Sequence, residues 1–386
     1  MIVLYLFSSP EGDIFLEPEI LSKPFLITPE NAHPFLTLGN YFDAMKACVL
    51  KNRGELLKRA LKDKWRKDWR LDDVAKIKIR SEKHGILYHL ASVEVFIKEI
   101  RVKFTLSTAL SKAGIECLVR EHDILERLNR TFGFPFLPEI YGIKEMACAT
   151  GQGTTEKMVM LSAQWFLDYH EWHLAMDPAA GRQKIKIWDL KRGHRYASST
   201  EAVRIIEESS KILALYYDCE DFSRIGSWHH AAGDFIVNTQ EDGRLNVRLT
   251  TVRKYEPLMA GFSERNVNPM IAMVYFFLDT TIHMRLDRLD GVGEMAWLDD
   301  FVVPAVVNGF FEGLHERETF GDGVSGAQSA ELLSLLKSFD RPELERILEP
   351  LIDHYATQDS DVMATFMSAH MDDHINVLRQ ALQDFH

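Results

Sequence analysis

Two groups of histidines carry the residue types in this chain that are best suited to chemistry. His170 and His173 stand three residues apart on an expected helix, and His229 and His230 are adjacent shortly before Asp234. Imidazole nitrogens combined with a carboxylate suit Zn, Fe or Mn. One hypothesis is therefore a histidine and carboxylate site of a metal-dependent enzyme. The sequence leaves open the alternative that these histidines are structural and pack in the interior.

A basic segment covers residues 51–70, where nine basic and three acidic residues give a local charge of +6. Trp65 and Trp69 lie in this segment at i, i+4 spacing. The segment either docks to an anionic partner or forms a solvated helix face that complements the acidic remainder of the chain. From residue 340 to the end, ten acidic and three basic residues make the tail acidic. Residues 51–70 and the C-terminal extension are thus two candidate surfaces for a protein partner.

The overall composition disfavours several classes of function. The chain has 386 residues, of which 46% are hydrophobic and 26% charged, and its net charge is −12. An acidic protein lacks the basic footprint that nucleic-acid binding needs. The apolar stretches are too short to span a membrane, and the apolar start lacks the features of a signal peptide. Four cysteines without C-x-x-C spacing are typical of reduced thiols, so we expect a cytoplasmic protein with no nucleic-acid or membrane partner.

The periodicity of the apolar residues predicts a defined order of elements. Residues 1–40 read as an arm of short strands and turns laid on another surface. Helices over 41–70 precede three strands, a helix and two strands, predicted at 75–80, 88–97, 101–110, 114–130, 139–143 and 158–161. After Trp165 the chain reads as mostly helical, with a capping box at Ser198 and Glu201 and one hairpin at 235–237 and 247–249. Further helices are predicted at 269–286 and 301–314, and three more from 330 to 386. Segregated strands and helices of this kind predict an α+β protein.

This order, with three motifs, resembles protein-kinase-like folds, especially the aminoglycoside and choline phosphotransferase branch. The first motif is the helix of residues 116–128 followed by residues 136–142 (FLPEIYG). The second, residues 158–165 (MVMLSAQW), is similar to the strand that leads into the hinge between the two lobes. The third joins residues 228–238 (WHHAAGDFIVN) to residues 242–251 (DGRLNVRLTT). It is similar to the catalytic loop and metal-binding hairpin of the family.

The resemblance covers about residues 76–320 and implies where a catalytic centre would lie. Asp234 falls at the family's metal-binding Asn, and a carboxylate there suits Mg²⁺. His229 falls at the catalytic Asp, where an imidazole can act as a general base near neutral pH. Thr250 falls at the metal-binding Asp and offers no charge. A second register aligns Gly233 and Asp234 with the Gly-Asp of the loop, which keeps the catalytic Asp but shifts the following Asn.

The resemblance also implies nucleotide contacts. Glu121 matches the helix glutamate that orients a lysine, but the position of that lysine falls near Ser107. Lys103 or Lys98 would then act from a neighbouring position, and Trp165 stands at the hinge as a further contact. The implied cofactors are ATP and Mg²⁺. Phosphoryl transfer depends on charge neutralisation by lysine and Mg²⁺, so the implied site is degenerate.

We therefore predict a two-lobed, protein-kinase-like α+β fold. The predicted parts are an N-terminal arm and basic helix (1–75), a small β-rich lobe (76–165), a helical lobe (166–328) and an acidic helical extension (329–386). The leading prediction is phosphoryl or nucleotidyl transfer to an unknown acceptor, with a nucleotide or small polar ligand in the cleft between the lobes. The alternatives are a catalytically inactive pseudokinase that acts as a binding or scaffold module, and the histidine metalloenzyme.

Overall fold

The computed structural model describes residues 1–9, 12–28, 31–62, 70–150, 153–189, 192–240, 242–258, 268–319, 326–358 and 361–386. The chain forms two compact units, each with its own set of internal contacts. Unit 1 contains residues 1–131 and 138–167, and unit 2 contains residues 132–137 and 168–386. The predicted boundary after residue 165 lies next to the point where the chain passes into unit 2. Residues 1–75 belong to the same unit as the β-rich segment that follows them, and residues 329–386 belong to unit 2.

Unit 1 is built on a seven-stranded sheet with the order β2-β1-β5-β6-β7-β9-β8. Its elements are β1 (Ile2–Ser9), β2 (Gly12–Phe15), α1 (Pro18–Leu21), β3 (Pro24–Thr28), β4 (Asn31–Thr37), α2 (Leu38–Leu61), β5 (Val74–His84), β6 (His89–Ile97), β7 (Ile100–Ala109), α3 (Lys112–Thr131), β8 (Ile140–Ala149) and β9 (Thr155–Gln164). β1 pairs in parallel with β5, and the other neighbours in this sheet are antiparallel. The prediction of an arm laid on another surface is therefore wrong for β1 and β2, which belong to the sheet itself, whereas β3 and β4 form a separate two-stranded sheet.

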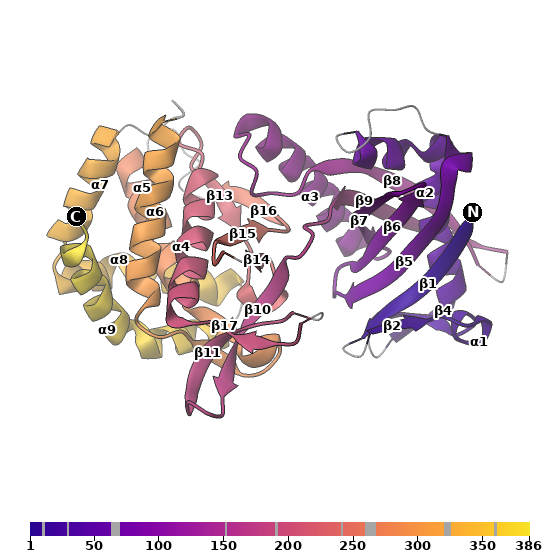
Figure 1. The fold of residues 1–386 in the computed structure, drawn as a ribbon. Helices are drawn as coiled ribbons and strands as arrows, with labels where there is room; N and C mark the ends of the chain where they lie inside the picture. The colour runs from indigo at the N-terminus through magenta and orange to yellow at the C-terminus, as the bar shows by residue number, and fades with distance from the viewer. Residues whose placement is uncertain are drawn as a thin grey trace. The chain divides into compact units, whose positions relative to one another are not determined.

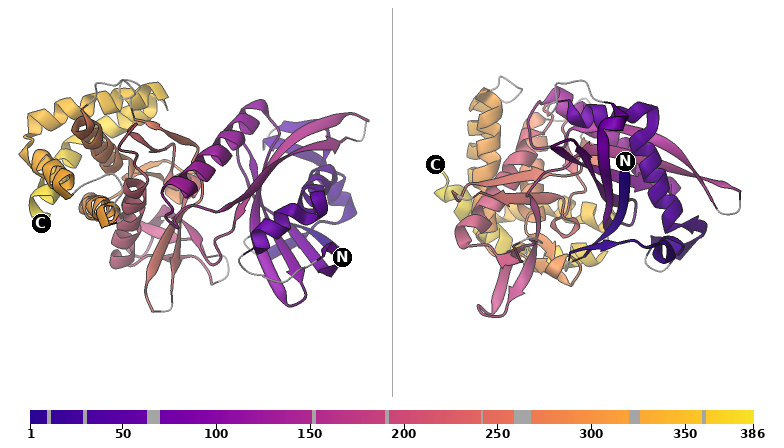
Figure 2. Two further views of the ribbon diagram at one scale, coloured as in Figure 1. Left: turned by 90° about the horizontal axis from the view of Figure 1, so that it is seen from above. Right: turned by 45° about the vertical axis from the view of Figure 1, so that its right-hand side comes forward.

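Helices α2 and α3 cover opposite faces of this sheet (Figure 1). Neighbouring residues of β9 show this, because Met160 packs in the core under α2 whereas Leu161 packs in the cluster that contains Leu118 of α3. Side chains alternate between the two faces of a strand, so one strand can serve both cores. The turned views show α2 along its face of the sheet (Figure 2). Trp65 and Trp69 of the predicted basic segment lie outside the described residues.

Unit 2 combines a five-stranded sheet, order β12-β11-β10-β14-β15, with a helical part. Its elements are β10 (His170–Asp177), β11 (Arg182–Ile187), β12 (Arg195–Tyr196), α4 (Ser199–Leu215), β13 (Ser223–Gly226), β14 (Phe235–Thr239), β15 (Leu245–Leu249), β16 (Lys254–Pro257), α5 (Pro269–His283), β17 (Leu286–Arg288), β18 (Met295–Trp297), α6 (Val302–Thr319), α7 (Gly326–Ser338), α8 (Arg341–Gln358) and α9 (Asp361–Asp384). The short 3-10 helices η2 (His230–Ala232) and η4 (Leu289–Gly291) connect strands. The chain just after Trp165 is thus β-structure, and the prediction that it is mostly helical is wrong there.

Helices α4 and α6 lie side by side and are in close backbone contact (Figure 1). A Cβ atom at Gly309 of α6 would overlap the carbonyl oxygen of Glu207, and one at Gly313 would lie 2.8 Å from Lys211 O. Ser210 Oγ donates to Val306 O at 3.1 Å across the same contact. Two glycines spaced by four residues therefore let the two helices approach each other. Among the described residues, no helix combines the length and apolar character needed to cross a membrane.

Candidate functional site

The segment that the motif comparison singles out is a loop between β13 and β14, residues 227–234. Ser227 has a φ of 55°, which is unusual for a residue with a side chain. Gly233 has a φ of 70°, and a Cβ atom there would lie 2.6 Å from Glu171 Oε2 and 2.8 Å from Oε1. Strained backbone of this kind persists only where the surroundings hold it in place. The contacts of Asp234 show what holds this loop.

Asp234 is 1% exposed and forms a two-pronged ion pair with Arg253. Arg253 Nη1 donates to Asp234 Oδ2 and Nη2 donates to Oδ1, each at 2.7 Å. Arg253 Nη1 also donates to Ser227 O at 3.0 Å, and the backbone N–H of His229 donates to Asp234 Oδ2 at 2.9 Å. The Asp234–Arg253 pair thus contacts the loop at its first residue, Ser227, at His229 and at its last residue, Asp234.

Thr250 contacts the backbone of Asp234 rather than its carboxylate. Its N–H and its hydroxyl both donate to Asp234 O, at 2.8 Å and 3.1 Å. Both carboxylate oxygens of Asp234 already accept hydrogen bonds, and a cation, Arg253, occupies the space beside them. These residues do not fit a divalent cation, which needs free oxygen ligands. The role of Asp234 and Thr250 as Mg²⁺ ligands stays a prediction, and the observed contacts give it no support.

His229 and His230 differ in their surroundings. His229 is half-buried, and its ring lies 5.5 Å from that of His283. His230 is 2% exposed, packs against Trp172 at 4.4 Å, and its Nε2 lies 3.3 Å from Met284 O. Burial lowers the pKa of His230 to about 3. His230 is therefore a neutral core residue, and His229 is the histidine of this pair within reach of solvent.

His170 and His173 lie on strand β10, and the expectation of a helix at this position is wrong. Because they are three residues apart on a strand, their side chains leave opposite faces. His170 Nε2 lies 3.6 Å from Asp189, whereas His173 is 2% exposed and its ring lies 4.5 Å from that of Trp188. Within the described ranges, no group of three or more histidine, cysteine or acidic side chains is arranged to hold a metal ion.

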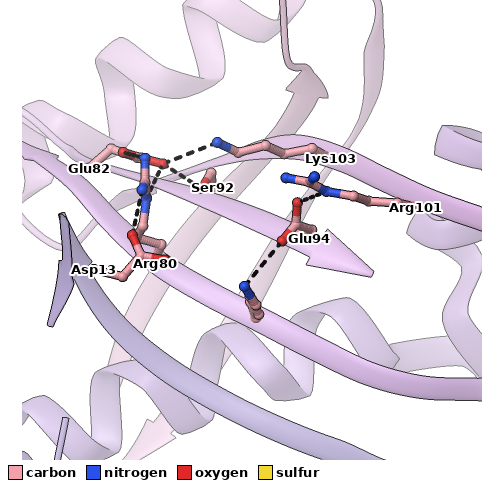
Figure 3. Close-up of polar contacts among 8 residues, drawn as sticks. Asp13, Arg80, Glu82, Ser92, Glu94, Arg101 and Lys103 are labelled. Carbon is pink, nitrogen blue, oxygen red and sulfur yellow. Dashed lines mark hydrogen bonds and ion pairs between the residues drawn. The ribbon is translucent and has the colours of Figure 1, made fainter. Parts of the chain in front are cut away.

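A second concentration of polar groups lies on the sheet of unit 1 (Figure 3). It is on the face opposite α2, because the alternate residues of the same strands pack in the core under α2. We call it the polar face. Its charged members are Asp13, Lys76, Lys78, Arg80, Glu82, Glu94, Arg101 and Lys103. Their neighbours Ile79, Val93 and Phe104 point into the core under α2. The alternation of the strands therefore places these charges together on one face.

Glu82 is the centre of the polar face. Arg80 Nε and Nη2 each donate to its carboxylate at 2.9 Å, the Ser92 hydroxyl also donates to it, and Lys103 Nζ lies 3.5 Å away (Figure 3). Arg80 Nη1 donates to Asp13 at 2.6 Å. Each acidic group on this face is therefore close to at least one cation.

Lys103 is one of the residues that the sequence resemblance implied for cofactor binding, and it contacts another of them. Its Nζ lies 3.6 Å from the centroid of the Trp165 ring, a cation–π contact. Burial lowers the pKa of Lys103, with Glu82 acting in the opposite direction. Glu121 is 4% exposed and accepts a hydrogen bond from the Tyr88 hydroxyl at 2.9 Å. The structure thus brings Lys103 and Trp165 together and gives Lys103 an ion-pair partner, Glu82, that sequence reasoning missed.

Arg253 was also missed, and no local pattern singles it out. The sequence did contain a signal for the polar face: residues 76–80 alternate between charged and apolar types, and such alternation indicates a strand with one face toward solvent. No protein-family model matches this chain, and no curated protein matches it in sequence.

Proposed function

We propose that this chain is a kinase-like binding protein that holds a small anionic ligand and does not transfer phosphate. The observation that carries the proposal is the two-pronged ion pair between Asp234 and Arg253. In the family that the sequence resembles, the residue at the position of Asp234 binds the metal ion that holds the phosphate. An arginine that takes both oxygens of this carboxylate removes the negative charge that would attract Mg²⁺.

The order of elements supports the kinase-like part of the proposal. Strands β5, β6 and β7, helix α3 and strands β8 and β9 follow one another in unit 1. The hairpin of β14 and β15 follows the 227–234 loop in unit 2, and helices α5 and α6 come later. This is the order that the three motifs imply. The strands β1 and β10–β12 are additions to that pattern.

The polar face is the surface to which we assign the ligand. It carries five basic and three acidic side chains, in a chain whose net charge is −12. Lys76 Nζ lies 4.3 Å from the ring centroid of Phe96, and Lys103 lies over Trp165. Cations held partly buried beside aromatic rings attract anions more strongly than solvated ones do. A nucleotide or another phosphate-bearing molecule is the ligand class that fits this face.

Isothermal titration calorimetry with ATP and with pyrophosphate, each with and without Mg²⁺, tests the proposal. We expect binding that does not require Mg²⁺ and that weakens in Lys103→Met. The matched control is Lys112→Met on α3, whose side chain is 92% exposed. If neither ligand binds under any of these conditions, the polar face has no such function. If binding requires Mg²⁺, the non-catalytic assignment is wrong.

A further inference from the structure

Two histidines face each other at the closed end of the β5–β6 hairpin, away from the polar face. His84 and His89 are paired across the two strands, and their Nδ1 atoms are 2.8 Å apart. Their ring centroids are 3.7 Å apart, with the rings inclined by 71°. Two nitrogens on one metal ion at the usual distance of about 2.0 Å, at right angles, would be about 2.8 Å apart. The spacing of this pair therefore suits two ligands in adjacent coordination positions.

The outer nitrogen of His84 has the partner that a metal-binding histidine usually has. His84 Nε2 lies 3.3 Å from the carbonyl oxygen of Ile27. A carbonyl oxygen only accepts, so Nε2 carries the hydrogen and neutral His84 presents the lone pair of Nδ1 toward His89. Histidines that bind metals commonly donate their second N–H to a backbone carbonyl, which fixes the tautomer.

Buried polar side chains lie around His89. His89 is 5% exposed and is paired with Thr108 across β6 and β7. The buried hydroxyls of Thr108 and Tyr41 lie close enough to hydrogen-bond with each other. The Tyr41 ring lies 6.1 Å from that of His89.

We propose that His84 and His89 form a two-histidine site for a divalent transition-metal ion, with Cu²⁺ as its tightest ligand. Imidazole nitrogen suits Cu²⁺, Ni²⁺ and Zn²⁺, and Cu²⁺ leads the affinity series. Mg²⁺ and Ca²⁺ prefer oxygen and do not bind. The exposed side of His84 leaves room for water in the remaining coordination positions.

The electrostatics of the pair are compatible with this site. Burial lowers the pKa of His84, and it lowers that of His89 to about 3. These shifts favour the neutral imidazole, which is the form that ligates metals. The groups that face them are the rings of Phe25 on β3 and Tyr41 on α2. A hydrogen bond shared between the two rings is the competing explanation of the short distance.

Titration of the full chain with Cu²⁺, followed by electron paramagnetic resonance and calorimetry, separates the two explanations. We expect one site with a two-nitrogen signature, weakened at least tenfold in His84→Gln, because even second-shell changes cost roughly 10–100-fold. His315→Gln, on α6 with a side chain that is 76% exposed, is the control and leaves this site unchanged. Equal Cu²⁺ affinity in wild type and His84→Gln would overturn the proposal.

A second measurement uses the unaltered protein and so does not depend on the folding of a variant. Diethyl pyrocarbonate modifies exposed imidazoles, and mass spectrometry of the peptide that contains His84 reports the extent. We expect Zn²⁺ to protect His84 and Mg²⁺ to leave it reactive. Modification of His84 at the same rate with and without Zn²⁺ would contradict the site.

Discussion

Arg253 donates two hydrogen bonds of 2.7 Å to the buried carboxylate of Asp234, and a third of 3.0 Å to Ser227 O. Asp234 also accepts a hydrogen bond from the backbone N–H of His229. The loop from residue 227 to residue 234 is therefore organised around one ion pair. A metal site would need the carboxylate of Asp234 to be free, whereas here Arg253 neutralises its charge.

Replacing Arg253 with Met tests how much this ion pair contributes to the free energy of unfolding. The change leaves a carboxylate that is 2% exposed without its cation, and breaking a buried pair in this way costs about 3–5 kcal/mol. Because Arg253 is itself 23% exposed, we expect a loss of about 3 kcal/mol in the free energy of unfolding, measured with urea. Lys254→Met is the control, since its pair with Glu256 is at the surface and contributes about 1 kcal/mol at most. A loss in Arg253→Met no larger than in the control would refute this role.

Gly309→Ala tests the close contact between α4 and α6. The added methyl group would overlap Glu207 O, so the helices must separate. Overpacking of this kind costs roughly 1–3 kcal/mol, and we expect the upper end of that range because the obstacle is backbone. His315→Ala, at an exposed position of the same helix, should change the free energy of unfolding by about 0.5 kcal/mol or less. Equal effects of the two substitutions in thermal or urea unfolding would show that the contact is loose.

Acidification should destabilise unit 2 through its buried histidines. Burial lowers the pKa of His230 and His374 to about 3 and that of His283 well below 6.5. Below pH 6.5 the unfolded chain binds protons on these residues, whereas the folded chain does not. The free energy of unfolding therefore has its full contribution from these histidines above pH 6.5 and decreases as the pH falls toward 3. Asp287, whose pKa burial raises to about 6, acts in the opposite direction.

A comparison of His374→Gln with wild type isolates one of these contributions, because the effect of Asp287 is the same in both proteins. Between pH 6 and pH 4.5 the wild type should lose up to about 1.4 kcal/mol per pH unit more than the variant. Urea unfolding at several pH values measures the two slopes. Parallel slopes would mean that His374 is not a buried neutral residue in the folded protein.

Glu82→Gln should strengthen anion binding on the polar face. The substitution removes the negative charge that lies beside Arg80 and Lys103, and a unit charge at such distances is worth about 1 kcal/mol even at high dielectric. We expect pyrophosphate affinity to rise by about fivefold, measured by calorimetry at low salt. Glu116→Gln on α3 is the control, since Glu116 is paired with the exposed Lys112. Weaker binding in Glu82→Gln would mean that Glu82 orders the site rather than competing with the ligand.

Elements with one buried face could be predicted from the sequence. Strands β5 and β7 and helix α3 each bury one face and follow the predicted pattern, and the capping box of Ser198 and Glu201 begins α4 as expected. The parallel pairing of β1 with β5 joins residues more than 70 positions apart, so no local pattern reports it. Strand β10 was missed because Trp172, His173, Leu174 and Ala175 are all buried, which removes the alternation that identifies a strand.

The candidate site was predictable only in part, for a related reason. Lys103 and Trp165 were singled out through the resemblance, and they are in contact. The ion-pair partners of two site residues were not predicted: Lys103 pairs with Glu82, and Asp234 pairs with Arg253. Each pair forms only because distant strands and loops meet in the folded chain. Such tertiary pairs leave no periodic signal in a single sequence.

The most direct test of the central claim is a single-turnover assay of ATP with Mg²⁺ and with Mn²⁺, using wild type and Asp234→Asn. If the chain is a non-catalytic binding protein, ATP turnover stays at the level of the buffer for both proteins, while calorimetry detects ligand binding that does not require the metal. Metal-dependent ATP turnover by the wild type that Asp234→Asn abolishes would contradict the account.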